Sequence, residues 1–107
     1  MTVFSREDLI ANSARYDILA TTPLSQFAVM NLADGEASGT MASEHPQSDQ
    51  WVFVLEGTGQ LRVGEETIDL SPGAVALVPA GADHQVIGPN KTLNFYAPVA
   101  YPESGNR

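Results

Sequence analysis

Short apolar segments separated by turn residues run through most of this chain and predict an antiparallel β protein. The expected strands are residues 15–20, 26–32, 50–56, 60–63, 67–70, 74–78, 84–87 and 92–97. Gly, Pro and Asn interrupt them about every eight to twelve residues, a spacing typical of an antiparallel sandwich or barrel. No second helical segment of useful length follows, which argues against the α/β classes. The segment 33–49 is rich in Gly, Ser, Asp and Pro and is expected to be mostly loop.

The first residues predict a short helix ahead of the strands. Ser5 is a suitable N-cap, Asp8 follows three positions later, and Leu9, Ile10 and Ala14 supply an apolar side. We therefore expect a helical segment over residues 1–14, a β domain over residues 15–99 and a flexible polar tail over residues 100–107.

The strand expected at 50–56 is apolar on both faces. Side chains alternate between the faces of a strand, so Trp51, Phe53 and Leu55 share one face while Val52 and Val54 share the other with Gln50. The interior of a barrel covers only one face. The other face needs either a second layer from the same chain or a second copy of it, and a homodimer is one of these two expectations.

Composition excludes several classes of function. The formal net charge is −8, from 13 acidic and 5 basic residues, and the basic residues are scattered singly. Nucleic acids and anionic membranes are therefore not expected partners. The absence of cysteine excludes disulfides, zinc–thiolate sites and cysteine nucleophiles, so any metal must be held by nitrogen and oxygen ligands.

The same composition suggests a soluble location. No apolar run approaches the roughly 20 residues that span a bilayer. The first residues lack the basic region and apolar segment of a signal peptide, so a cytoplasmic protein is expected.

The chain contains two histidines, His45 and His84, and each lies next to turn residues that lead into an expected strand. Pro79 and Gly81 define a turn just before His84, and Gln50 follows His45 by five residues. Neutral imidazole and an amide oxygen are suitable ligands for Zn, Ni, Mn or Fe. By spacing alone, two isolated histidines are more often surface or hydrogen-bonded residues than metal ligands.

The stretch around His84 resembles a conserved motif of the cupin superfamily. Gly73, Pro79, Gly81 and His84 match the glycine, proline, glycine and histidine of the second cupin motif, and Gly88 stands where an asparagine is usual.

The stretch around His45 resembles the first cupin motif in a degraded form. His45 and Gly57 match its second histidine and final glycine, while Gln50 takes the glutamate position and Ser43 that of the first histidine. The resemblance to the family covers roughly residues 26–98.

The resemblance implies a small single-domain cupin: an antiparallel jelly-roll β-barrel, commonly dimeric, with a divalent metal ion inside. His45, Gln50 and His84 would hold the metal, with water in place of the ligand lost at Ser43. If the segment is extended, Ser43 lines the pocket beside His45 and Glu44 faces away. Tyr96 shares a strand face with Asn94 and is expected to line the pocket if that face points inward.

Three hypotheses for the site follow. It binds a divalent metal with open water positions, or it is a metal-free polar pocket for a small ligand, or it is a vestige in a protein that works through its surface. The first predicts a small enzyme acting on a small polar or carboxylated organic molecule, with Tyr96 and Asp49 as remote acid–base candidates. The second predicts a non-catalytic ligand-binding or sensing module.

Overall fold

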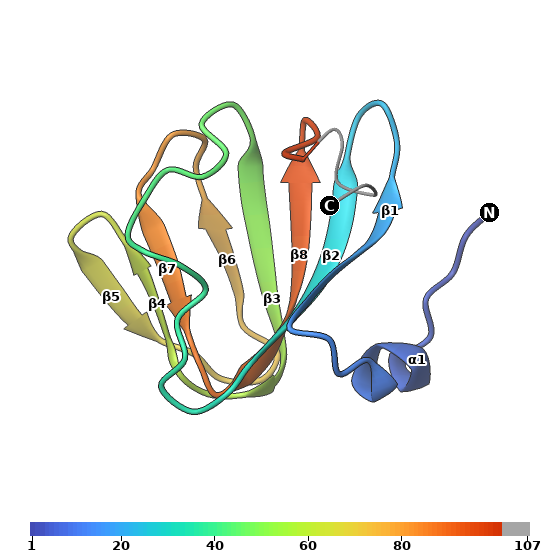
Figure 1. Cartoon of the computed structure of the whole chain (residues 1–107), viewed down its shortest axis with the longest axis horizontal. Helices are drawn as coiled ribbons and strands as arrows, with labels where there is room; N and C mark the ends of the chain where they lie inside the picture. Colours follow the sequence, from blue (N-terminus) through green and yellow to red (C-terminus); the bar gives the residue numbers. More distant parts are fainter. Residues whose placement is uncertain (102–107) are drawn as a thin grey trace.

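The computed structural model of the chain describes residues 1–101, which form one short helix and eight strands (Figure 1). Their bounds are α1 Arg6–Ala11, β1 Tyr16–Thr21, β2 Gln26–Leu32, β3 Asp49–Gly57, β4 Gln60–Val63, β5 Glu66–Asp69, β6 Val75–Val78, β7 His84–Ile87 and β8 Asn90–Ala97. Each expected strand is present to within two residues at either end. The predicted all-β fold with a short N-terminal helix is confirmed.

The strands form two antiparallel sheets. The larger has the order β1-β2-β8-β3-β6 and the smaller the order β5-β4-β7. In Figure 1 the loop between β2 and β3 crosses the smaller sheet, where isolated bridges pair Ala37 with Ile87 and Ala42 with His84. The loop is thereby fixed against β7, and residues that precede β3 come to lie beside the start of β7.

The main core lies between the sheets and takes its residues from alternate strand positions. On β3 the inward side chains are Gln50, Val52 and Val54, and all three are buried. The apolar members of this core are Met30, Leu32, Val52, Val54, Leu61, Leu70, Val78 and Val86. Strand alternation in β3 therefore places an amide side chain, Gln50, at the end of an otherwise apolar row.

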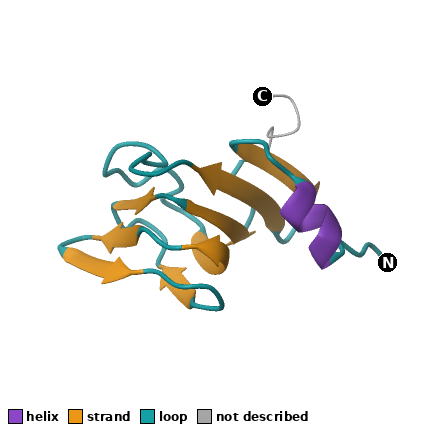
Figure 2. Cartoon of the chain, turned by 90° about the horizontal axis from the view of Figure 1, so that it is seen from below, coloured by secondary structure: helices purple, strands orange, loops and turns teal. Residues whose placement is uncertain are grey.

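Helix α1 covers part of the outer face of the larger sheet. The Ser5 hydroxyl accepts a hydrogen bond from the Asp8 backbone N–H at 3.0 Å, as the sequence predicts for the N-cap. Leu9 then packs with Val29 and Leu93, and partly buried Phe53 joins this cluster. Figure 2 shows α1 at the end of the molecule opposite the smaller sheet. Ala14, expected in the helix, lies beyond its end at Ala11.

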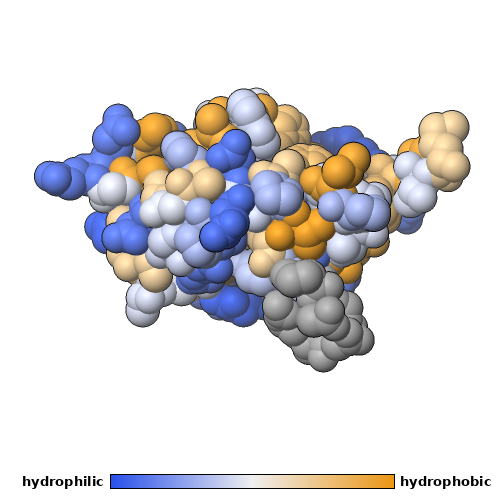
Figure 3. Space-filling model, turned by 90° about the horizontal axis from the view of Figure 1, so that it is seen from above, coloured by the Kyte–Doolittle hydropathy of each residue, from blue (hydrophilic) through white to orange (hydrophobic). Residues whose placement is uncertain are grey.

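Polar and apolar residues are unevenly distributed over the surface. In the view of Figure 3, hydrophilic residues gather toward the end that carries the β4–β5 hairpin, and hydrophobic residues lie nearer the middle. Glu65 and Glu66 in that hairpin are exposed. Within the described part of the chain, no helix has both the length and the apolar character to cross a membrane.

Only part of the segment expected as a flexible tail, 100–107, is described. Residues 102–107 lie outside the described residues. Tyr101 is described, and its backbone is hydrogen-bonded to the Gln26 side chain.

Candidate functional site

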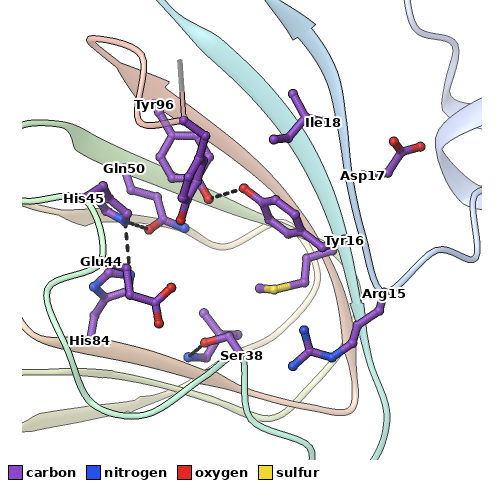
Figure 4. A pocket seen from close by; sticks show the side chains of 13 residues that line it. Arg15, Tyr16, Asp17, Ile18, Ser38, Glu44, His45, Gln50, His84 and Tyr96 are labelled. Carbon is purple, nitrogen blue, oxygen red and sulfur yellow. Dashed lines mark hydrogen bonds between the residues drawn. The ribbon is translucent and has the colours of Figure 1, made fainter. Parts of the chain in front are cut away.

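A pocket of about 470 Å³ opens beside the main core. Its walls come from β1, β2, the β2–β3 loop, β3, β7, β8 and Tyr101. Figure 4 shows the lining side chains converging from these elements. The polar lining residues are Arg15, Tyr16, Asp17, Ser38, Glu44, His45, Gln50, His84, Tyr96 and Tyr101.

The position of His84 is set by the turn between β6 and β7. The Ala82 N–H donates to the Pro79 carbonyl at 3.1 Å, and Gly81 has φ of +84°. This is the geometry of a type II turn, whose third residue favours glycine. The turn ends two residues before β7, so His84 begins the strand and its side chain is buried.

A second turn places His45 opposite it. The Ser48 N–H donates to the His45 carbonyl at 3.1 Å, which folds the chain back just before β3. Gln50 then lies at the second position of β3, paired with Val78 on one side and Tyr96 on the other. His45, Gln50 and His84 are 5%, 3% and 8% exposed, so the structure brings all three expected ligands together in a buried position.

A chain of amides fixes the orientation of the Gln50 side chain. The Thr92 carbonyl can only accept, so the amide nitrogen of Asn94 must face it, at 3.3 Å. The Asn94 oxygen then accepts from Gln50 Nε2 at 2.8 Å. Gln50 Oε1 is left facing His45 Nε2 at 2.7 Å.

Backbone carbonyls fix the tautomers of the two histidines in the same way. His45 Nδ1 lies 3.1 Å from the Ser48 carbonyl, and His84 Nδ1 lies 3.1 Å from the Ala82 carbonyl. Since a carbonyl cannot donate, each Nδ1 carries a proton, and in the neutral rings each Nε2 presents a lone pair.

With both rings neutral, three acceptor atoms converge at this point. The Nε2 atoms of His45 and His84 are 3.2 Å apart, and Gln50 Oε1 is the third acceptor. Burial lowers the pKa of His84, against the opposing effect of its hydrogen bond to the Ala82 carbonyl, so the neutral ring of His84 is favoured at pH 7. A cation bound at this point would satisfy all three acceptors.

The donor set fits a first-row divalent metal ion. Two ligand atoms at about 2.1 Å from one ion lie roughly 3.0 Å apart in octahedral coordination and roughly 3.4 Å apart in tetrahedral coordination. The two separations in the structure, 2.7 and 3.2 Å, are together closer to the octahedral value. The set is small and uncharged, however, and among residues 1–101 no three His, Cys, Asp or Glu side chains gather into a group that could hold a metal.

Tyrosines form the wall next to His45. Tyr96 and Tyr16 share a hydrogen bond between their hydroxyls at 2.9 Å (Figure 4), and the rings of Tyr96 and His45 meet edge to face at 5.1 Å. Burial, and after it the neighbouring Tyr16 and Tyr101, raise the pKa of Tyr96 well above its usual value. Tyr96 therefore remains protonated at neutral pH and serves as a hydrogen-bonding group rather than a base.

Charged groups lie at the rim. Arg15 pairs with Glu36 at 2.6 Å and also donates to the Ala37 carbonyl at 2.9 Å, which ties the β2–β3 loop to the start of β1. A hydrogen bond from the Ala33 backbone N–H, followed by the one from Arg15, lowers the pKa of Glu36. Arg15 also lines the pocket and is the one Lys or Arg among its described lining residues.

Residues 43 and 44 are placed differently from the expectation for an extended strand. Glu44, expected to face away, lines the pocket, and Figure 4 shows its carboxylate directed inward. Ser43 is not among the lining residues, and its buried hydroxyl has no hydrogen-bond partner in the described part of the chain. The reason is local: residues 38–48 form turns and an isolated bridge, so the alternation of a strand does not apply there.

The lining residues that sequence reasoning missed include Arg15, Tyr16, Glu44 and Tyr101. Tyr16 begins β1 opposite Met30, and a count of inward positions on that strand is the signal that could have found it. Arg15, Glu44 and Tyr101 lie outside the strands, where periodicity gives no direction. Asp49, expected as a remote acid–base candidate, instead accepts from the Ala80 N–H at 2.9 Å.

The comparison with known protein families now gives the class of protein. Residues 28–95 match the family described as "Cupin domain". The chain therefore belongs to the cupin family.

Two curated proteins are similar to this chain in sequence. An uncharacterized protein of Streptomyces coelicolor is 34% identical over 68 residues, which is 63% of this chain. An uncharacterized protein of Acanthamoeba polyphaga mimivirus is 27% identical over 105 residues, or 91% of this chain. The chain spans 65% and 64% of the length of these two curated relatives.

A solved structure shows the same fold over nearly the whole chain. The BH2720 protein of Bacillus halodurans is 28% identical, with a TM-score of 0.83 over 92% of this chain and 80% of its own.

Proposed function

We propose that this chain is a small jelly-roll cupin that binds one divalent metal ion through His45, Gln50 and His84 and takes a small polar or carboxylated organic molecule into the same pocket. The convergence of three buried acceptor atoms carries the proposal. The donor nitrogens of the same side chains already face other oxygens: His45 Nδ1 faces the Ser48 carbonyl, His84 Nδ1 the Ala82 carbonyl, and Gln50 Nε2 the Asn94 side chain. Zn, Ni, Mn and Fe all accept this nitrogen and oxygen donor set. Bound there, the metal would supply Lewis-acid or redox chemistry.

The remaining walls of the pocket suit a small oxygen-rich molecule. Arg15 offers a positive charge at the rim, and the paired hydroxyls of Tyr16 and Tyr96 offer both a donor and an acceptor. Glu44 lines the pocket with its carboxylate directed inward, and it is the candidate group for exchanging a proton with a bound molecule. A volume of about 470 Å³ is in the lower range of known small-molecule sites.

We expect the Gln50→Leu variant to bind Zn²⁺ or Ni²⁺ roughly tenfold or more weakly than the wild type, because it removes one ligand while keeping the side-chain volume. Isothermal titration of untagged, metal-free protein measures this. Gln47→Leu makes the same substitution at an exposed position in the adjacent turn and should leave the affinity unchanged. Equal affinities for the two variants would show that Gln50 is not a ligand.

One observation favours a second function, that of a metal-free ligand-binding or sensing module. The donor set is uncharged, and the described residues bring no third His, Asp, Glu or Cys into it. In that case untagged protein would contain no metal and take up none of the four ions from solution, yet would still bind small carboxylates in the pocket. Elemental analysis before and after soaking distinguishes the two functions.

The outer face of the larger sheet supports the proposal that the protein is a homodimer. Phe53 and Leu55 are covered by the α1 cluster, so the intrachain expectation holds for them. Trp51 is 47% exposed and pairs in register with exposed Leu77 and Phe95. These three residues form one apolar row with no charge within it, and such a row is complementary to itself about a twofold axis.

A Trp51→Glu variant is therefore expected to be monomeric at concentrations where the wild type sediments as a dimer. The buried charge would have no partner in the interface, which makes association unfavourable. Sedimentation velocity measures the change. Ile68→Glu places the same charge on an exposed apolar position of the smaller sheet and should leave the dimer intact. A wild type that sediments as a monomer would contradict this proposal.

A further inference from the structure

We propose that Tyr101, held in place by the Gln26 side chain, is a specificity-determining residue of the pocket, which limits the molecules that reach His45 and His84. The inference deepens the proposed function and rests on it for the identity of the ligand. The placement of Tyr101 itself does not depend on a metal.

The nitrogen and the oxygen of the Gln26 amide both hydrogen-bond to the backbone of Tyr101. Gln26 Nε2 donates to the Tyr101 carbonyl at 2.9 Å, and the Tyr101 N–H donates to Gln26 Oε1 at 3.0 Å. The second amide proton of Gln26 goes to Thr21 Oγ1 at 3.0 Å. The Gln26 side chain is 2% exposed, so these hydrogen bonds are shielded from water.

This attachment brings the Tyr101 ring against the histidine site. The ring packs edge to face on Tyr96 at 5.5 Å and on Tyr16 at 6.1 Å, and its centroid lies 6.5 Å from that of His45. Tyr101 also lines the pocket together with these residues. Tyr101 therefore forms a wall of the pocket although it follows the last strand in the sequence and belongs to neither sheet.

Two variants separate the effect of the Tyr101 ring from the effect of the hydrogen bonds that hold its backbone. The hydrogen bonds to Gln26 use only the backbone of residue 101, so Tyr101→Ala removes the ring and leaves both bonds available. Gln26→Met removes the bonds and leaves the ring. If both variants act by displacing the Tyr101 ring, either change should open the pocket. The double variant should then be little more accessible than each single variant.

Carbethoxylation by diethyl pyrocarbonate tests access without any metal. The reagent modifies neutral imidazole, and the chain has two histidines, both in the pocket. In metal-free full-length protein we expect Tyr101→Ala and Gln26→Met to be modified roughly tenfold faster than the wild type. Tyr101→Phe keeps the ring, and Thr21→Val removes the Thr21 hydroxyl while leaving the hydrogen bonds between Gln26 and Tyr101. Both variants should react at the wild-type rate.

The dependence on ligand size is measured with hydroxamates on cobalt-loaded protein. The wild type should bind acetohydroxamate more tightly than benzohydroxamate, and Tyr101→Ala should reduce that preference by roughly tenfold. Failure to take up cobalt would count against the proposed function, and the carbethoxylation rates would then decide this inference. Equal rates for wild type, Tyr101→Ala and Gln26→Met would overturn it, as would an unchanged hydroxamate preference in Tyr101→Ala.

Discussion

The His84→Ala variant is expected to lose high-affinity binding of divalent metal, with affinity lower by more than about 100-fold than in the wild type. The substitution removes one of the two imidazoles and leaves Gln50 Oε1 beside His45 Nε2. Titration of metal-free protein with Zn²⁺, Ni²⁺, Mn²⁺ and Fe²⁺, together with the metal content of untagged protein as purified, measures the loss.

The matched control for this prediction is the adjacent position. Gln85→Ala truncates the next residue of β7, whose side chain donates to the Gly39 carbonyl and does not line the pocket. It should retain wild-type metal affinity, even if the β2–β3 loop is loosened. Wild-type affinity in His84→Ala would mean that the two histidines do not share an ion.

The Lys91→Met variant is expected to lower the free energy of unfolding by about 2–4 kcal/mol. The ammonium group of Lys91 donates to the carbonyls of Leu9, Ile10 and Asn12 at 2.8, 2.8 and 2.5 Å, and the residue is 6% exposed. These carbonyls lie at the C-terminal end of α1, where a cation is favourable and where no intrahelical N–H is available. Methionine keeps the apolar stem but leaves the carbonyls without these donors.

The effect should be specific to the buried lysine. Lys91 lies in β8 and attaches helix α1 to this strand, and α1 covers Val29 and Leu93. Replacing Lys91 therefore also weakens the apolar cluster of Leu9, Val29 and Leu93. Urea denaturation at pH 7 measures the change, and Arg62→Met, at an exposed position of β4, should alter stability by less than about 0.5 kcal/mol. Equal stabilities for the two variants would show that Lys91 does not anchor the helix.

The strands could be predicted from the sequence because the local signals agree with one another. Glycines with positive φ lie at strand ends or in the turns between strands, where the pattern breaks, as Gly57 and Gly81 do. Gly57 also lies so close to the β7–β8 connection that an added Cβ would be 2.5 Å from the Pro89 carbonyl. Its place in the motif therefore reflects close packing as well as a turn.

The site could be predicted only where strands or turns carry it. His84 and Gln50 stand at the starts of strands, and their direction follows from alternation. Glu44 and Tyr101 lie in irregular segments, where direction depends on tertiary contacts such as the Gln26 amide. Lys91 looks like one of five scattered basic residues in the sequence, and its burial depends on α1 lying across β8.

The most direct test of the central claim is anomalous scattering from a crystal of untagged protein soaked in Ni²⁺ or Mn²⁺. We expect one anomalous peak inside the pocket, at the point where His45 Nε2, His84 Nε2 and Gln50 Oε1 converge. No peak at that point, after soaks that place metal elsewhere on the protein, would contradict the claim that these three residues form a metal site.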